Sequence, residues 1–80
     1  MKIQLLFFGI CTDITGVDTM PFDLNSKASI ADLKSKLQSK FSNFDGINNF
    51  AIAVNETYAS DSEILSDGDT VAIIPPVSGG

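Results

Sequence analysis

One helical segment in an otherwise strand-forming chain limits the folds open to this sequence. Ser29 stands before the segment and Asp32 follows three residues later, which is typical of a helix N-terminus where side chains satisfy free backbone N–H groups. The apolar residues of the segment recur at spacings of three, four and four: Ile30, Leu33, Leu37 and Phe41. This spacing predicts an amphipathic helix over about residues 30–41. Three lysines lie mostly off its apolar stripe: Lys34, Lys36 and Lys40.

The other apolar segments are short and rich in β-branched and aromatic residues. They predict strands over residues 3–10, 17–24, 50–54 and 70–74, with a further short stretch around Tyr58. Pro21 places the second strand at an edge of the sheet, because proline cannot donate to a ladder on both sides. We expect connections at residues 12–16 and 43–49, and a tight turn at residues 67–69.

This order of elements predicts an α+β fold. Eighty residues form one domain with a modest core. A hairpin, one helix and further strands indicate a β-grasp roll, in which the main helix packs across a mixed sheet of four to five strands and the last strand lies beside the first. The β-grasp domain is expected to cover residues 1–76. Residues 77–80 are expected to form an extended tail that ends in Gly79-Gly80.

Composition excludes several classes of function. Hydrophobic residues make up 44% of the chain and charged residues 19%, which indicates a folded protein. The sequence has no His and one Cys, so it lacks the usual general base, a Cys–His nucleophile pair and a Cys/His zinc site. It also lacks the glycine-rich motifs that bind phosphate groups. We therefore expect no activity from the chain alone, and no bound metal or cofactor.

The charge balance bears on partners and location. Ten acidic and five basic residues leave a net charge of −5, and the five lysines do not cluster. This argues against nucleic acid and favours a basic patch on a partner protein. Apolar runs are too short to span a bilayer, so no membrane association is expected. The first eight residues combine a charge with an apolar stretch, as in a signal peptide, but they lack a small-residue cleavage site. Together with the lone cysteine, this predicts a cytoplasmic protein.

Two groups of residues allow a functional and a structural interpretation. Cys11 is either a redox or sulfur-relay thiol or a small, semi-buried hydrophobic residue; no basic neighbour in the sequence favours the thiolate. The dense carboxylates could bind calcium, but they lack the EF-hand spacing. A turn whose carboxylates accept nearby backbone N–H groups is the preferred interpretation. These carboxylates belong to Asp61, Glu63, Asp67 and Asp69.

The end of the chain carries the clearest functional signal. Pro75-Pro76 stops the last strand and stiffens the start of the tail, so the tail projects from the sheet. Gly79-Gly80 has no Cβ atoms and is slim enough to carry the terminal carboxylate into a narrow tunnel. A frayed end of small residues is the alternative. The residues alone leave both interpretations open.

A family resemblance covers essentially all 80 residues. The residues that carry it are Val54-Asn55, the run Leu65-Ser66-Asp67-Gly68-Asp69-Thr70-Val71-Ala72-Ile73-Ile74-Pro75-Pro76-Val77-Ser78-Gly79-Gly80, the opening Leu6-Phe7-Phe8 and the capped helix at Ser29. Together they resemble the small, sulfur-carrying subunit of molybdopterin synthase, a ubiquitin-like family. The most specific part is the Asp-Gly-Asp turn followed by one strand, Pro-Pro and terminal Gly-Gly.

The resemblance implies a mechanism for the Gly80 carboxylate. A ubiquitin-activating-like adenylyltransferase would use ATP to adenylate it, and a sulfur donor such as a cysteine desulfurase or a rhodanese-like protein would convert it to a thiocarboxylate. The tail would then enter the large subunit of molybdopterin synthase, in a heterotetramer, and give its sulfur to cyclic pyranopterin monophosphate. Gly79 would thread the tunnel. ATP and the catalytic lysines would belong to the partners.

The resemblance also implies a docking surface. The residues expected there are Tyr58, Ile74, Pro75, Pro76, Val77 and Ser78. An aliphatic residue is more usual at Tyr58, although a tyrosine can bury its ring and keep its hydroxyl wet. Ile74 is equally well interpreted as ordinary sheet core. Residues 9–16 depart from the family pattern, which often has Arg or Glu there.

Three other functions remain as alternatives. The thiamine-pathway sulfur carrier has the same fold and the same Gly-Gly, but its members are usually shorter and lack the Pro-Pro-Val step found at residues 75–77. A protein modifier would form isopeptide bonds through Gly80. A ubiquitin-like interaction domain would have an inert tail. The Pro-Pro-Val step favours the molybdopterin interpretation.

Overall fold

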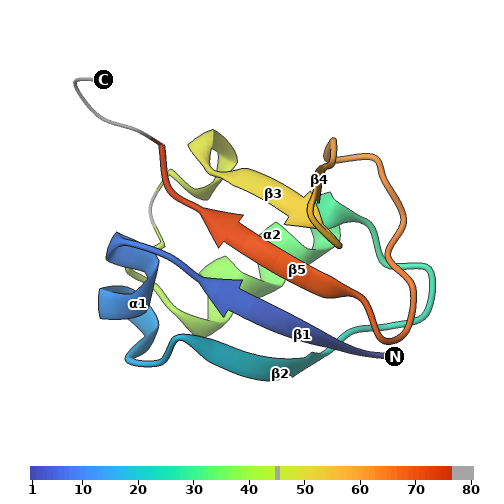
Figure 1. Cartoon of the computed structure of the whole chain (residues 1–80), viewed down its shortest axis with the longest axis horizontal. Coiled ribbons are helices and arrows are strands. Elements are labelled where there is room, and N and C mark those ends of the chain that lie inside the picture. Colours follow the sequence, from blue (N-terminus) through green and yellow to red (C-terminus); the bar gives the residue numbers. More distant parts are fainter. Residues whose placement is uncertain (45, 77–80) are drawn as a thin grey trace.

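The computed structural model describes residues 1–44 and 46–76. A five-stranded mixed sheet has the order β2-β1-β5-β3-β4, and the main helix α2 crosses behind it in Figure 1. The strands are β1 (Lys2–Phe7), β2 (Thr19–Asp23), β3 (Ala51–Val54), β4 (Thr57–Tyr58) and β5 (Thr70–Ile74). The helices are α1 (Ile10–Thr15), α2 (Ile30–Lys40) and the 3-10 turn η1 (Ile47–Asn49). The predicted α+β β-grasp fold is confirmed.

The pairing of the strands agrees with the predicted topology. β1 and β5 are parallel neighbours at the centre of the sheet, so the last strand does return beside the first. β2 pairs with β1 alone and forms one edge, where the missing N–H of Pro21 is tolerated. The short strand β4 forms the other edge and is joined to β3 by a tight hairpin.

The N-terminus of α2 is satisfied from two sources. Ser29 Oγ accepts from the Asp32 N–H at 3.2 Å, and Asp32 Oδ2 accepts from the Ser29 N–H at 2.9 Å, which confirms the predicted cap. The next two N–H groups, of Ile30 and Ala31, donate to backbone carbonyls of the loop between β4 and β5 at 2.9 and 3.0 Å. This loop is therefore tied to the start of the helix.

The core lies between α2 and the inner face of the sheet. Ile30, Leu33 and Leu37 are fully buried, as the helical stripe predicts, and they share one cluster with Val71 and Ile73 of β5. Lys34 lies off the apolar stripe but is also nearly buried, because its side chain is only 7% exposed and its Nζ contacts Asp61 Oδ1 at 2.7 Å. The β4–β5 loop folds over the helix and covers this side chain while supplying its counter-charge.

Two connections are more ordered than the sequence indicates. β1 ends at Phe7, and residues 10–15 form α1, which is too short to show a helical pattern by itself. Within residues 43–49, Phe44 is fully buried and its ring lies 6.0 and 5.9 Å from those of Phe41 and Phe50. The aromatic cluster draws this segment into the core. In the described ranges, no helix is long and apolar enough to cross a membrane.

Candidate functional site

Alternate residues of β5 divide the sheet into two different surfaces. Val71 and Ile73 point toward α2 and are fully buried, whereas Ala72 and Ile74 point to the opposite side and are half-buried. We call this opposite side the open face; it is turned toward the viewer in Figure 1. The strand register gathers small and apolar residues there: Leu6, Ala51, Ala53, Tyr58, Ala72 and Ile74.

The open face carries a shallow hollow of about 400 Å³. Its lining comes from three strands, from the residue that follows β1 and from the turn between β3 and β4: Leu6, Phe8, Ala53, Asn55, Glu56, Thr70, Ala72 and Ile74. The floor is apolar, and Phe8 stays 49% exposed at its rim. A contiguous apolar surface of this kind on a small protein indicates a docking site for a partner.

Two of the predicted docking residues lie on this face. Tyr58 is 74% exposed on β4, opposite Ala53 of β3, and Ile74 is half-buried at the end of β5, opposite Ala51. Ile74 therefore lies outside the core cluster under α2. Contact of these residues with a partner stays a prediction, but the structure does bring them onto one surface.

The sequence interpretation missed two other residues of the open face. Leu6 and Phe8 line the hollow, while Leu5 and Phe7 between them are buried against α2. Period-two alternation within the first strand is the signal that separates the two pairs. Because residues 5–8 are all apolar, the sequence does not show which of them face the core.

The end of β5 leads directly to the predicted tail. The strand stops at Ile74, as expected from the two prolines after it. Pro75 is half-buried and Pro76 is exposed. Pro75 packs on Gly9, where a Cβ would lie 3.2 Å from Pro75 Cγ. Val77, Ser78, Gly79 and Gly80 lie outside the described residues, so their roles stay predictions.

The carboxylates of the turn at residues 67–69 accept hydrogen bonds from backbone N–H groups. Asp67 Oδ1 accepts from the Lys2 N–H at 2.7 Å, and Asp69 Oδ2 accepts from the Ser66 N–H at 2.8 Å. Asp69 Oδ1 also accepts from the Asn55 side-chain amide at 3.0 Å. These bonds agree with the predicted turn. Within the described ranges, no three acidic, His or Cys side chains are grouped to hold a metal ion.

Cys11 lies on α1 and is fully buried in the core. Desolvation raises the pKa of its thiol, although backbone hydrogen bonds oppose the effect. A buried thiol with a raised pKa is a poor nucleophile. This placement agrees with the interpretation of Cys11 as a small hydrophobic residue.

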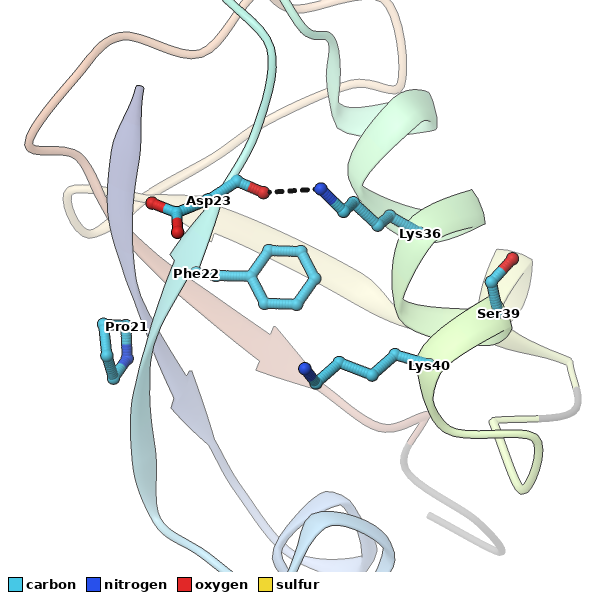
Figure 2. Close-up of a pocket in the computed structure, with 6 residues that line it drawn as sticks. All are labelled: Pro21, Phe22, Asp23, Lys36, Ser39 and Lys40. Carbon is cyan, nitrogen blue, oxygen red and sulfur yellow. Dashed lines mark hydrogen bonds between the residues drawn. The ribbon is translucent and has the colours of Figure 1, made fainter.

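A second cavity, of about 460 Å³, lies between β2 and the C-terminal half of α2 (Figure 2). Lys36 reaches across it, and its Nζ donates to the Asp23 carbonyl at 2.8 Å while lying 5.7 Å from the centre of the Phe22 ring. Lys36 and Pro21 thus occupy or remove backbone groups of the edge strand, which hinders the addition of another strand. The contacts of Lys36 in this cavity hold α2 against the edge strand β2. The open face remains the candidate functional site.

The β-grasp sheet, with the main helix on one face and an apolar open face on the other, defines a ubiquitin-like protein. The model of the ThiS family matches residues 5–80. The chain belongs to the ThiS family.

Similar proteins agree with this assignment. A molybdopterin synthase sulfur carrier subunit of Chlamydomonas reinhardtii is 36% identical, with full coverage of both chains. A solved complex of subunits 1 and 2 of the molybdopterin-converting factor from Helicobacter pylori contains a chain that is 27% identical, with full coverage of both chains and a TM-score of 0.69. SAMP1 from Haloferax volcanii has a TM-score of 0.85 with full coverage of both chains, but at 21% identity it shows the fold alone.

Proposed function

We propose that this chain is the sulfur carrier of molybdenum cofactor biosynthesis and works as the small subunit of molybdopterin synthase. The observation that carries the proposal is the direct continuation of a central strand of the sheet, beside an apolar open face, into Pro75-Pro76 and the terminal Gly-Gly. The end-to-end similarity to a protein named as such a carrier supports the same function.

The proposed chemistry takes place at the Gly80 carboxylate. Adenylation by a ubiquitin-activating-like adenylyltransferase joins the carboxylate to AMP and releases pyrophosphate from ATP. The persulfide of a sulfur donor, such as a cysteine desulfurase or a rhodanese-like protein, then displaces AMP and forms an acyl disulfide. A thiol reduces its S–S bond, which releases the thiocarboxylate and leaves the thiol oxidised as a disulfide. The sulfur is transferred to cyclic pyranopterin monophosphate in the large subunit, and the carboxylate is regenerated. The single cysteine fits a reducing compartment, so we place the cycle in the cytoplasm.

The chain itself contributes positioning to this reaction. Its sequence has no His, and its one cysteine is buried, so proton transfers fall to residues of the large subunit. The open face, with Ile74 and Tyr58, docks on that subunit, and the adjacent chain end enters its active site. Docking thereby converts sulfur transfer into a reaction between groups held close together. A heterotetramer with two large subunits completes the proposal.

Removal of Gly80 tests the proposed function. The variant without Gly80 is expected to fold and bind the large subunit but to transfer no sulfur, because it has lost the reacting carboxylate position. The measurement is single-turnover product formation, with circular dichroism as the control for folding. Sulfur transfer by this variant contradicts the proposal.

The mass of the chain isolated from its native host separates the alternatives. A sulfur carrier shows a form in which one terminal oxygen is replaced by sulfur, whereas a modifier is found joined to other proteins through Gly80. An inert domain shows neither. Thiocarboxylated chain that supplies thiazole synthesis and fails with the molybdopterin synthase large subunit would instead identify the thiamine-pathway carrier.

Gly79→Ala tests the threading role of Gly79. If the tail crosses a constriction, the added methyl group displaces the reacting atom, and an error of about 1 Å costs on the order of a hundredfold in rate. The variant is therefore expected to fold and dock normally but to transfer sulfur far more slowly at saturating large subunit. A wild-type rate would make Gly79 a simple spacer.

A further inference from the structure

The turn between β3 and β4 has a strained residue at its second position. Val54 pairs with Thr57, so Asn55 and Glu56 form a two-residue hairpin loop. Both have positive φ angles, of 50° and 73°. Such turns favour Asn at the first position and Gly at the second. Asn55 fits this preference, whereas Glu56 holds a side chain in a conformation that glycine would adopt without strain.

Glu56 also has an unusual position on the surface. It is the one charged residue among the eight that line the hollow of the open face, where its neighbours are apolar or neutral. Other carboxylates nearby have structural partners: Asp61 pairs with Lys34, and Asp67 and Asp69 accept backbone N–H groups. Within the described residues, the Glu56 carboxylate has no such hydrogen bond or ion pair.

The charge of this part of the chain favours a cationic partner. All five lysines belong to residues 1–40, so the second half of the sequence contains acidic residues and no basic ones. A carboxylate at the rim of an apolar surface loses hydration when a partner covers that surface. Docking would be penalised unless the partner supplies a positive charge at this point.

We propose that Glu56 is a specificity contact of the docking surface, and that the large subunit places a Lys or Arg side chain against it. This inference rests on the proposed function and adds the chemistry of the partner at one position. The strain at Glu56 is consistent with it, because strained residues persist where function needs their side chain. The apolar floor provides the contact area, and Glu56 selects among partners with a similar apolar surface.

The test compares binding of the full-length chain to the large subunit at low and high salt. Glu56→Gln keeps the shape of the side chain and removes its charge, so the Kd should rise about five- to tenfold at low salt, and the difference should shrink as salt increases. Glu63→Gln is the matched control, because Glu63 is an exposed acidic residue of the same half that does not line the hollow. Its Kd should change less than about twofold.

A second variant separates loss of charge from damage to the fold. Glu56→Gly relieves the positive φ, so its melting temperature should equal or exceed that of the wild type, while its Kd should rise as in Glu56→Gln. Unchanged binding by Glu56→Gln, or an equal loss in Glu63→Gln, overturns the inference. Failure of the wild-type chain to bind the large subunit contradicts the proposed function itself, so the two failures are distinguishable.

Discussion

The two faces of the sheet carry similar apolar residues, but only one face is buried. On β5, Ile73 is fully buried under α2, while the next residue, Ile74, is half-buried on the open face. The same contrast holds between the buried Phe7 at the end of β1 and the 49% exposed Phe8 that follows it. An apolar residue therefore serves stability on one side of this sheet. On the other side it forms a surface that is available to a partner.

The largest effect is expected from a matched pair of substitutions on β5. Ile73→Asp places an unpaired charge in the core and should leave the chain unfolded, because the penalty exceeds the stability of a small domain. Ile74→Asp should keep the fold and strongly weaken binding to the large subunit. Circular dichroism and a binding titration on both variants check this, and equal unfolding of the two would erase the distinction between the faces.

A milder pair uses truncation. Leu37→Ala removes a fully buried side chain and should lower the free energy of unfolding by about 2–5 kcal/mol. Tyr58 is 74% exposed, so Tyr58→Ala should change that free energy by less than about 0.5 kcal/mol. Its Kd for the large subunit should rise about tenfold if the ring is a docking contact. Urea unfolding and calorimetric titration measure the two quantities, and an unchanged Kd would remove Tyr58 from the docking surface.

The ion pair between Lys34 and Asp61, on the side of the molecule that carries α2, allows a comparison with a smaller expected effect. Asp61→Asn leaves the ammonium group of Lys34 almost buried without its counter-charge, whereas Lys34→Met removes the charge and keeps an apolar side chain of similar length. Thermal unfolding should show the larger loss of stability for Asp61→Asn. Asp61 is 58% exposed, which limits the loss because solvent screens the pair. A greater loss in Lys34→Met would mean that the pair stabilises the fold directly.

The smallest effect concerns thiol reactivity on the two sides. Burial raises the pKa of the Cys11 thiol, so its alkylation by iodoacetamide should be slow and should need a higher pH than that of an exposed thiol. Tyr58→Cys in a Cys11→Ala background supplies the exposed reference. The thiol of Cys11 has a higher pKa in the folded chain than in the unfolded chain. The folded state is therefore destabilised as the pH rises from the unfolded pKa through the folded pKa, where the buried thiol must lose its proton. Equal alkylation profiles for the two thiols would contradict this account.

The elements with local signals were predicted well. The cap at Ser29 and the spacing of the apolar residues indicated α2, and the observed helix ends at Lys40, within one residue of the prediction. Turn and proline signals bounded the last strand at residues 70–74, as observed. In each case the deciding interactions lie within a few residues along the chain, so the sequence pattern carries them.

The misses involve contacts between distant residues. α1 is too short for a periodic signal, and Phe44 is buried in the core, where its ring lies 6.4 Å from that of Phe7 on β1. The burial of Lys34 depends on a counter-charge, Asp61, that comes 27 residues later in the sequence. No local pattern contains these partners.

The sequence by itself determined the main helix α2, the strands and their succession along the chain. These elements depend on local periodicity and on residues such as proline, whose backbone restrictions act within a few positions. The sequence did not determine which face of the sheet is covered. Period two shows that Leu6 and Phe8 share a face and that Leu5 and Phe7 share the other, but not which pair α2 buries. Only the tertiary structure decided this, because burial depends on how distant elements pack together. The same packing places Glu56 at the rim of the open face.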